Sequence, residues 1–590
     1  MAGDSKLDAV DRVGAYQRLA LQAWLTSGSS ESTLDLLNDA LSIGIAIAST
    51  QAMRSRFLRL GGLVDSAIYV SRHALSESRT FFDSLQASLA LASAVFEREK
   101  DKQVRGLSKD FGALDEAMDA LASVKLGGPA AALRWEGMLG LWLLLRDRPN
   151  KDDTFLATLM AEPGSRAYRL ADNPPFVSAR EGAPPDRFAE PDARKEMVQA
   201  LASSGLFKLA QMEAMTADPS DGEDLTTDAA IEDIVDYAEF VDATGDCISR
   251  IYRKRLSQDS TIETEIQELI GLAHAYWLSL DYAGERPEFT LDELGTQLAR
   301  RWGARFCAVD FDPDNFSVIW GHVVREDERT IEQYGHSLKT RFAAIDQMVS
   351  SGWMEWLTDG EAPQIGGWTP THEAVYWIRP AWGESSIRAW ERVTYPDKIA
   401  RVEKQVVQLK SVDDSLLHAD PYANIPGASL RLSNQSLEEL RDSLRRAGHS
   451  GNDLREAFMN QYWYITYESN LVAHEGRHAL DMFYYGDRFE TWNATQVELR
   501  AKLSEVVFSP DPMFTATNSI VIFYTSGSGE GHGAASALIR RHLVDWMNAH
   551  ASEIRGFDTT EAPLPQLDLL SRDQLVAAIT ELDPMVAAKN

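Results

Sequence analysis

The stretch "LVAHEGRHALDMF" (residues 471–483) determines how the C-terminal part of the chain is interpreted. The run around this motif predicts a helix. His474 and His478 are four residues apart and share one face of that helix, so both imidazole rings can reach one metal ion. The stretch therefore predicts either a metal-binding helix or an ordinary helix that carries two incidental histidines.

The pattern His-Glu-x-x-His contains the parts that hydrolysis at a metal ion requires. Neutral imidazoles bind zinc, and the ion lowers the pKa of a bound water toward ~7. Glu475 can then accept a proton from that water as the general base. Gly476 costs about 1 kcal/mol of helix stability relative to alanine, which an ordinary helix has little reason to accept. These features favour the metal-binding interpretation.

A catalytic zinc site also needs a third protein ligand and an open fourth position. A second amphipathic helix is predicted over residues 491–508, and it carries Glu498 and Glu505 on one face, seven residues apart. Asp481 and Asp487 are closer alternatives. The spacing alone leaves all four carboxylates, Glu498, Glu505, Asp481 and Asp487, as candidates for the third ligand.

The motif HEGRH, followed after nineteen residues by ELRA, resembles the active-site motifs of the gluzincin metallopeptidases, the thermolysin-like class. The resemblance covers residues 474–501. It implies a zincin-like catalytic region with zinc bound by His474, His478 and Glu498, and with Glu475 as the general base.

Asp481 lies on the same helix face as the two histidines. It is predicted either to accept a hydrogen bond from the second ring nitrogen of a metal-bound histidine or to be a surface carboxylate. Further along, residues 519–546 predict a β-rich piece, a glycine-rich loop and a helix. We expect the loop to bring His532 or Tyr524 to a developing oxyanion as an electrophilic donor, the alternative being an incidental histidine.

The fold class expected for the whole chain is mainly α, in three parts. Helical periodicity predicts an N-terminal bundle or array in residues 1–172. Residues 173–400 begin with a linker rich in proline and contain nine of the fifteen tryptophans, interleaved with strand-like pieces, which predicts a mixed α/β region. Residues 401–590 return to helical spacing and are expected to form the catalytic domain, ending in a helix.

Composition limits the partners of this chain of 590 residues. Its 44% hydrophobic and 25% charged residues are typical of a folded, soluble protein, for which the cytoplasm is the default compartment. A net charge of -31 argues against binding to nucleic acid or anionic lipid. The only two cysteines, Cys247 and Cys307, form no metal-binding pattern. No secretory signal and no apolar run of the ~20 residues of a membrane span is predicted.

We therefore expect a zinc-dependent hydrolase, most directly a peptidase that cleaves peptides or proteins with a water activated by Glu475. A hydrolase of another amide or an ester would use the same residues. The alternative from another class is a non-catalytic helical interaction or scaffold protein with a structural or vestigial zinc site.

Overall fold

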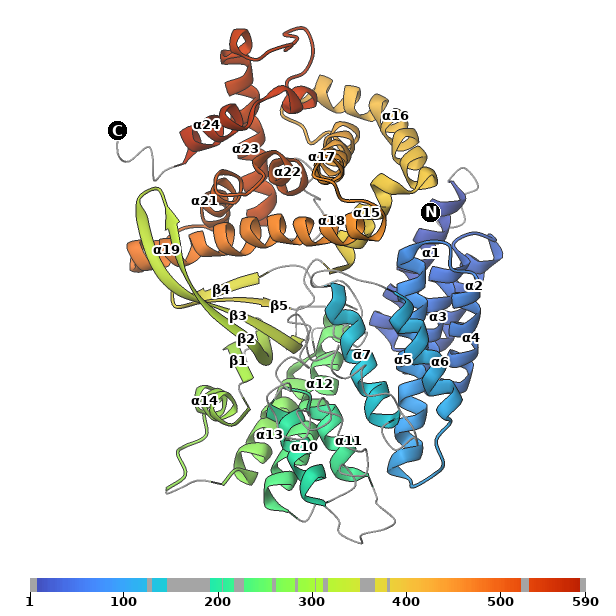
Figure 1. Ribbon diagram of the computed structural model, residues 1–590. Coiled ribbons are helices and arrows are strands. Elements are labelled where there is room, and N and C mark those ends of the chain that lie inside the picture. Colours follow the sequence, from blue (N-terminus) through green and yellow to red (C-terminus); the bar gives the residue numbers. More distant parts are fainter. Residues whose placement is uncertain are drawn as a thin grey trace. The chain divides into compact units, whose positions relative to one another are not determined.

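The computed structural model shows a mostly helical protein, with 77% helix, 7% strand and one small curled sheet (Figure 1). This confirms the expected fold class. The described residues are 8–124, 130–145, 191–203, 205–216, 228–256, 261–281, 285–302, 304–310, 317–350, 367–378, 383–520 and 530–583. The chain forms two compact units, the first of residues 1–324 with 345–364 and the second of residues 325–344 with 365–590.

The first unit begins with an array of helices that pack against their sequence neighbours. They are α1 (Ala9–Ser27), α2 (Ser30–Ser42), α3 (Ile47–Leu60), α4 (Val64–Ser76), α5 (Phe81–Val104), α6 (Phe111–Ser123) and α7 (Ala130–Leu145). Trp24, Leu37 and Phe57 are buried together at the start of this array. Burial of such large side chains supplies most of the driving force for packing, as helical periodicity predicts.

The described residues of the first unit contain five further helices. They are α10 (Pro191–Ser203), α11 (Phe207–Met215), α12 (Ala229–Leu256), α13 (Glu263–Ser279) and α14 (Leu291–Trp302). The predicted domain limit at 172/173 and all but the last residues of the proline-rich linker lie outside the described residues. The domain limits therefore stay predictions.

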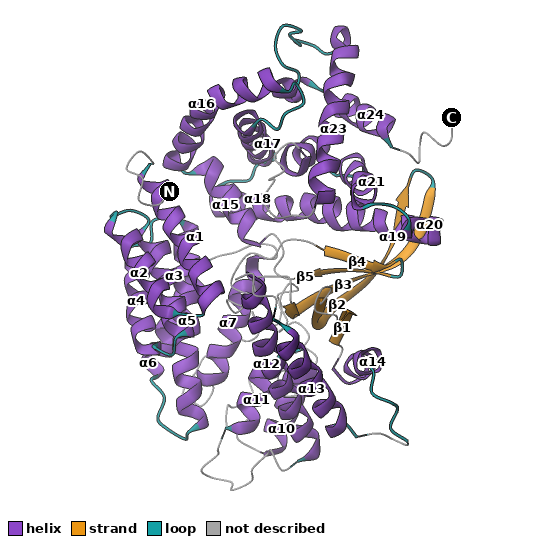
Figure 2. Ribbon diagram, turned by 180° about the vertical axis from the view of Figure 1, so that it is seen from behind, coloured by secondary structure: helices purple, strands orange, loops and turns teal. Residues whose placement is uncertain are grey.

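The sheet has five strands in the order β1-β2-β3-β5-β4. The strands are β1 (Ala304–Asp310), β2 (Ser317–Gln333), β3 (His336–Ser350), β4 (Gly367–Thr371) and β5 (Ala374–Ile378). Tyr334 and Gly335 both have positive φ, 51° and 78°, in the two-residue turn between β2 and β3. This conformation matches the twist of a tight hairpin. β4 is an edge strand, and Figure 2 shows β4 and β5 next to α19 (Gly476–Tyr485), which belongs to the same unit.

The second unit is helical around its part of the sheet. Its helices are α15 (Gly383–Thr394), α16 (Pro396–Ala419), α17 (Pro426–Arg446), α18 (Gly451–Thr466), α19 (Gly476–Tyr485), α20 (Asp487–Glu490), α21 (Ala494–Val507), α22 (Pro512–Thr515), α23 (Glu530–Ala549) and α24 (Arg572–Leu582). A π-helical segment, η5 (Tyr467–Glu475), joins α18 to α19, so one continuous helix carries the whole motif. Short 3-10 segments, η7 (Ala551–Glu553) and η8 (Leu564–Leu569), precede α24.

One core cluster joins α17, α21, α23 and α24. Leu503 and Val506 of α21 are fully buried in it, together with Leu543 of α23 and Leu575 of α24. Packing on this side fixes the rotation of α21 about its axis, and the opposite side of α21 faces the motif helix.

The sequence predicts a β-rich piece that begins at residue 519, but the structure shows no strand at its first two residues. Ser519 and Ile520 end a second π-helical segment, η6 (Ala516–Ile520), and residues 521–529 lie outside the described part of the chain. The helix predicted to follow is α23.

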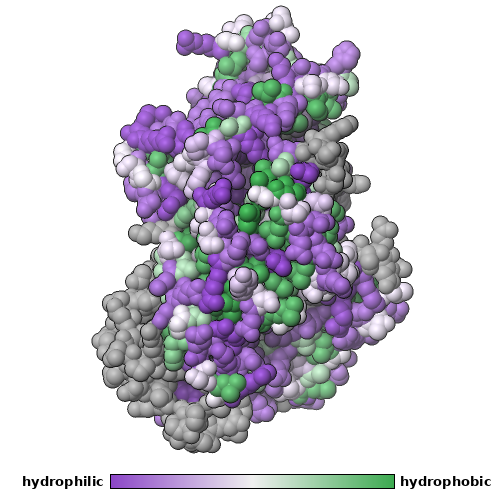
Figure 3. Space-filling view, turned by 90° about the vertical axis from the view of Figure 1, so that its right-hand side faces the viewer, coloured by the Kyte–Doolittle hydropathy of each residue, from purple (hydrophilic) through white to green (hydrophobic). Residues whose placement is uncertain are grey.

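Hydrophilic side chains cover much of the coloured part of the face drawn in Figure 3, and hydrophobic side chains gather in its middle. Within the described residues, none of the helices is both long enough and apolar enough to cross a bilayer.

Candidate metal centre

The motif lies where the long helix changes from π-helical to α-helical winding. His474 and Glu475 end η5, and His478 lies in the first turn of α19. Both histidines are buried, and their ring centroids are 5.0 Å apart. The two rings therefore lie side by side as helical spacing predicts, and π-helical turns of this kind occur frequently at functional sites.

Close packing on the sheet explains the glycine inside the motif. A Cβ atom at Gly476 would lie 3.0–3.3 Å from side-chain atoms of Ile331 in β2. Gln333, also in β2, donates a hydrogen bond of 2.9 Å to the backbone oxygen of Ala473. Gly476 thus has a packing reason of its own, and its presence alone does not favour catalysis.

Glu498 comes to the histidines from α21, whose first turn is fixed by a capping box between Asn493 and Gln496. Its Oε2 lies 3.4 Å from Nε2 of His474, and its Oε1 lies 3.9 Å from Nε2 of His478. The three residues implied as zinc ligands by the motif are therefore brought together.

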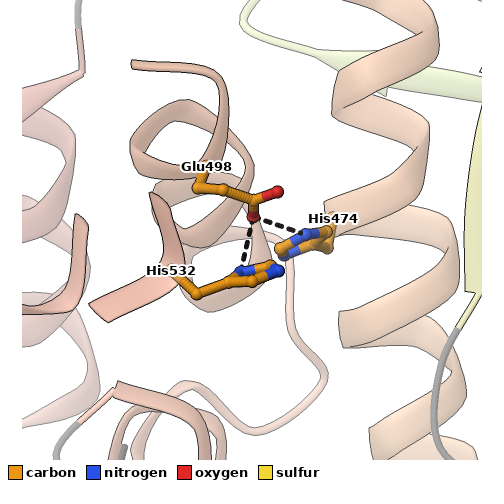
Figure 4. Close-up of side chains that lie close together, drawn as sticks. All are labelled: His474, Glu498 and His532. Atoms are coloured by element: carbon orange, nitrogen blue, oxygen red, sulfur yellow. Dashed lines mark ion pairs between the residues drawn. The ribbon is translucent and has the colours of Figure 1, made fainter. Parts of the chain in front are cut away.

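His532 approaches the same carboxylate from the first turn of α23 (Figure 4). Its Nδ1 lies 2.7 Å from Oε2 of Glu498, and its ring centroid lies 6.1 Å from that of His474. Gly531 permits this approach, because a Cβ atom there would lie 2.9 Å from Cβ and 3.0 Å from the backbone of Ala494 in α21. Tyr524, the other predicted donor, lies outside the described residues.

The donor atoms around Glu498 are better placed to bind a cation together than to form regular hydrogen bonds with one another. His474, Glu498 and His532 each offer one ligand atom, all within 4.8 Å of one another. Oε2 of Glu498 is buried and has no regular hydrogen-bond partner among the described residues, although two ring nitrogens face it. Imidazole nitrogens and a carboxylate oxygen are ligands that zinc accepts.

Glu505 contacts the opposite side of the first histidine. Its Oε2 lies 3.0 Å from Nδ1 of His474, and its side chain is almost fully buried. This contact leaves Nε2 of His474 directed toward Glu498. Glu505 was an alternative third ligand, but the structure places it where a metal-binding histidine usually has a supporting carboxylate.

Asp481 neither contacts a histidine of the described chain nor lies on the surface, which corrects both alternatives predicted for it. Its two oxygens accept hydrogen bonds from Nε of Arg477 at 3.0 and 3.1 Å and from Arg500 at 2.6 and 2.7 Å. Two buried guanidinium groups compete for this carboxylate, and a neutral imidazole is the weaker donor. Asp487, the remaining alternative, is exposed on α20.

Arg477 extends this ion network to the end of the described chain. It donates to both oxygens of Asp583 at 3.0 Å and to Oγ of Ser504 at 2.8 Å, and it is fully buried. The network joins the motif helix, α21 and the residue that follows α24. None of its members was predicted apart from Asp481.

Glu475 has a partner from β4 that sequence reasoning did not find. Oγ1 of Thr369 lies 2.7 Å from Oε2 of Glu475 and 3.1 Å from its backbone oxygen. Nothing in the local pattern of "GGWTPT" indicates this contact, since the two residues are more than one hundred positions apart.

Charges in the centre are strongly coupled. Burial alone would lower the pKa of His474, but contacts with Glu498 and Glu505 raise it to about 10. Burial and the neighbouring His474 lower the pKa of His478 to about 3. Burial opposes ionisation of Glu498, yet contacts with His474 and His532 bring its pKa well below the ordinary range. Burial raises the pKa of Glu475. These pKa directions favour a cationic His474 and a neutral His478 beside the carboxylate of Glu498, and a divalent cation bound there could replace the proton of His474.

Comparison of the chain with family models, with curated proteins and with solved structures found no match. A function must therefore be inferred from these side chains.

Proposed function

We propose that the protein is a zinc-dependent hydrolase, most directly a peptidase, that binds its metal through His474, His478 and Glu498. The observation that supports this most is the buried Oε2 of Glu498, which faces two ring nitrogens without regular hydrogen-bond geometry. The order of these residues along the chain agrees with the gluzincin resemblance. When bound, zinc supplies a Lewis acid and lowers the pKa of water.

Glu475 is assigned the role of general base. It follows His474 directly on the motif helix, and its raised pKa makes the carboxylate a better proton acceptor than an exposed glutamate. Thr369 holds one carboxylate oxygen at 2.7 Å and so orients the group. Glu505 holds the ring of His474. His532 is the remaining polar side chain beside Glu498 and is assigned the role of donor to the oxyanion.

Substitution of the base tests the proposal. Glu475→Gln keeps the size and a hydrogen-bonding oxygen, so zinc content should stay at the wild-type level while kcat falls by ~10²–10⁴-fold. Zinc is measured by elemental analysis and activity by mass spectrometry of a mixed peptide library. Glu490→Gln, at an exposed position of α20, is the matched control and should change neither quantity. Equal cleavage by Glu475→Gln and wild type would contradict the proposal, and so would a wild-type protein that takes up no zinc.

The second candidate function is a non-catalytic scaffold with a structural zinc site. The observation that favours it is His532, because a fourth protein ligand would close the metal's coordination. A closed structural site rejects small oxygen ligands, whereas a catalytic site admits them. Binding of acetohydroxamate to the zinc-loaded protein separates the two candidates.

A further inference from the structure

We propose that His532 is a fourth protein ligand of the metal in the substrate-free protein, and that an incoming oxygen ligand displaces it. The inference rests on the proposed function and deepens it, because it describes how the same centre is closed at rest and opened for reaction. Nothing in the HExxH and Glu498 motif itself requires a third imidazole.

The first support is position. Nδ1 of His532 is the ring nitrogen closest to Glu498, at 2.7 Å, whereas the corresponding distances from His474 and His478 are 3.4 and 3.9 Å. Its ligand atom lies within 4.8 Å of those of His474 and Glu498. A cation bound by these two residues is therefore within reach of the His532 ring.

The second support is the difference in burial among the four side chains. The side chains of His474, His478 and Glu498 are 9%, 11% and 17% exposed, whereas that of His532 is 36% exposed. Loss of an exposed ligand leaves a position that solvent or substrate can reach, while loss of a buried one leaves a cavity.

The third support is a difference between the surroundings of His474 and those of His532. The second nitrogen of His474 contacts the buried Glu505, which fixes its ring. His532 lies in the first helical turn of α23, and its side chain is 36% exposed, so solvent can reach its ring. His474 is thus the permanent ligand and His532 the exchangeable one.

The exchange itself is a simple ligand substitution. With a metal bound, an oxygen of the incoming group would take the position of Nδ1 of His532, and the imidazole would leave uncharged. The displaced ring would stay near the centre, because α23 is held there by its own core packing. The same residue can therefore close the resting centre and later serve the oxyanion.

Cobalt-substituted protein gives a direct test with His532→Ala. X-ray absorption should find three imidazoles around cobalt in the wild type and two in the variant. Zinc affinity, measured by competition with a chelator, should fall by about tenfold or more. Acetohydroxamate should bind the variant more tightly than the wild type, because it no longer displaces a ring.

His449→Ala is the matched control. Its side chain is also 36% exposed, and its Nδ1 also lies 2.7 Å from a carboxylate oxygen, that of Asp453, but it is not part of the centre. The control should leave all three quantities at wild-type values.

Two results would overturn the inference. One is an unchanged imidazole count in His532→Ala. The other is weaker acetohydroxamate binding by that variant, which is the behaviour of a residue that only donates to an oxyanion. Failure of the proposed function is a separate result, since then the wild type takes up no metal or His474→Ala keeps its full affinity.

Discussion

A single carboxylate, Glu505, determines which ring nitrogen of His474 is directed toward Glu498. Its contact with Nδ1 at 3.0 Å leaves Nε2 free to face Glu498. Loss of such a supporting partner typically costs 10–100-fold in metal affinity. We therefore expect Glu505→Ala to weaken zinc binding by about that factor, measured by chelator competition, with Glu490→Ala as an exposed control.

The same experiment decides between the two glutamates of α21. Glu498→Ala should lose zinc more severely than Glu505→Ala, since it removes a ligand and not a support. If Glu505→Ala loses all zinc while Glu498→Ala keeps it, the ligand assignment is wrong.

Cys247 allows a test at the residue scale in the first unit. Burial raises the pKa of this thiol to about 11, compared with 9.0 for an unperturbed cysteine. Because the unfolded chain ionises first, the stability that depends on the neutral thiol is fully present below pH 9 and is lost as the pH rises toward 11. Serine at this position keeps a donor for the 3.1 Å contact with the oxygen of Glu265 but does not titrate.

We expect the urea midpoint for unfolding of the first unit, which contains Cys247, to fall more steeply in the wild type than in Cys247→Ser between pH 8 and pH 10.5. Other groups that titrate in this range are common to both proteins and cancel in the difference. Parallel curves would show that the thiol is not coupled to folding.

At the scale of elements, regular helices were the most predictable part of the chain. The apolar spacing of "AAIEDIVDYAEFVDATGDCISRIYRKRL" predicts a helix over residues 229–256, and α12 has the same limits. The strands were only partly predicted. β2 continues to Gln333 through a polar run in which exposed residues alternate with Ile331 and Gln333, both buried against the motif helix. That alternation is visible in the sequence, but the charges in it obscure the buried face.

The candidate site divides in the same way. Spacing within one helix placed His474 beside His478, and it could also have paired Arg477 with Asp481, four residues apart. Spacing could not choose between Asp481 and Glu505 as the partner of a histidine. That choice depends on the rotation of α21, which the burial of Leu503 and Val506 in a distant core sets.

Close contact between β4 and the motif helix leads to a prediction about Gly367. A Cβ atom there would lie 2.3 Å from Cδ2 of Leu471, 2.8 Å from the backbone oxygen of Tyr376 and 3.3 Å from Cγ of Glu475. Gly367→Ala should therefore cost about 1–3 kcal/mol of stability by overpacking, and it should lower activity more than zinc content by moving Thr369 away from Glu475.

Gly271→Ala provides a control of opposite sign. This glycine lies in α13 with open space around it, so alanine should raise stability by up to ~1 kcal/mol through helix propensity. Equal stability of Gly367→Ala and wild type in thermal unfolding would contradict the proposed contact between β4 and the helix.

At the scale of the whole molecule, the candidate site collects residues from four separated stretches of the second unit. Thr369 comes from the sheet, His474 from the motif helix, Glu498 from α21 and His532 from α23. Each stretch is held by packing that does not involve a metal, such as the core cluster on the far side of α21. The centre is therefore formed largely in advance, and binding a metal has little chain to order.

The end of the described chain takes part in this arrangement through Asp583. Its carboxylate accepts two hydrogen bonds of 3.0 Å from Arg477, and both side chains are fully buried. Removal of one partner from a buried ion pair leaves the other charge uncompensated and typically costs 3–5 kcal/mol of stability. Because Arg477 keeps Asp481 and Ser504 as partners, we expect Asp583→Ala to cost about 3 kcal/mol.

Hydrogen exchange is the appropriate measurement, since a chain with two compact units need not unfold in one step. Amides of α19 and α24 should exchange ~10²-fold faster in Asp583→Ala, while those of α12 in the first unit should not change. Asp573→Ala removes an exposed carboxylate from the first turn of the same helix and should change the stability of α24 by less than ~1 kcal/mol.

A double variant separates loss of the charge pair from loss of packing. Arg477→Met added to Asp583→Ala should restore part of the protection against exchange, because the double variant also removes the buried guanidinium group that had lost Asp583 as a partner. If the single and double variants exchange equally fast, the faster exchange results from lost helix packing and not from the charge of Arg477 that lost its partner.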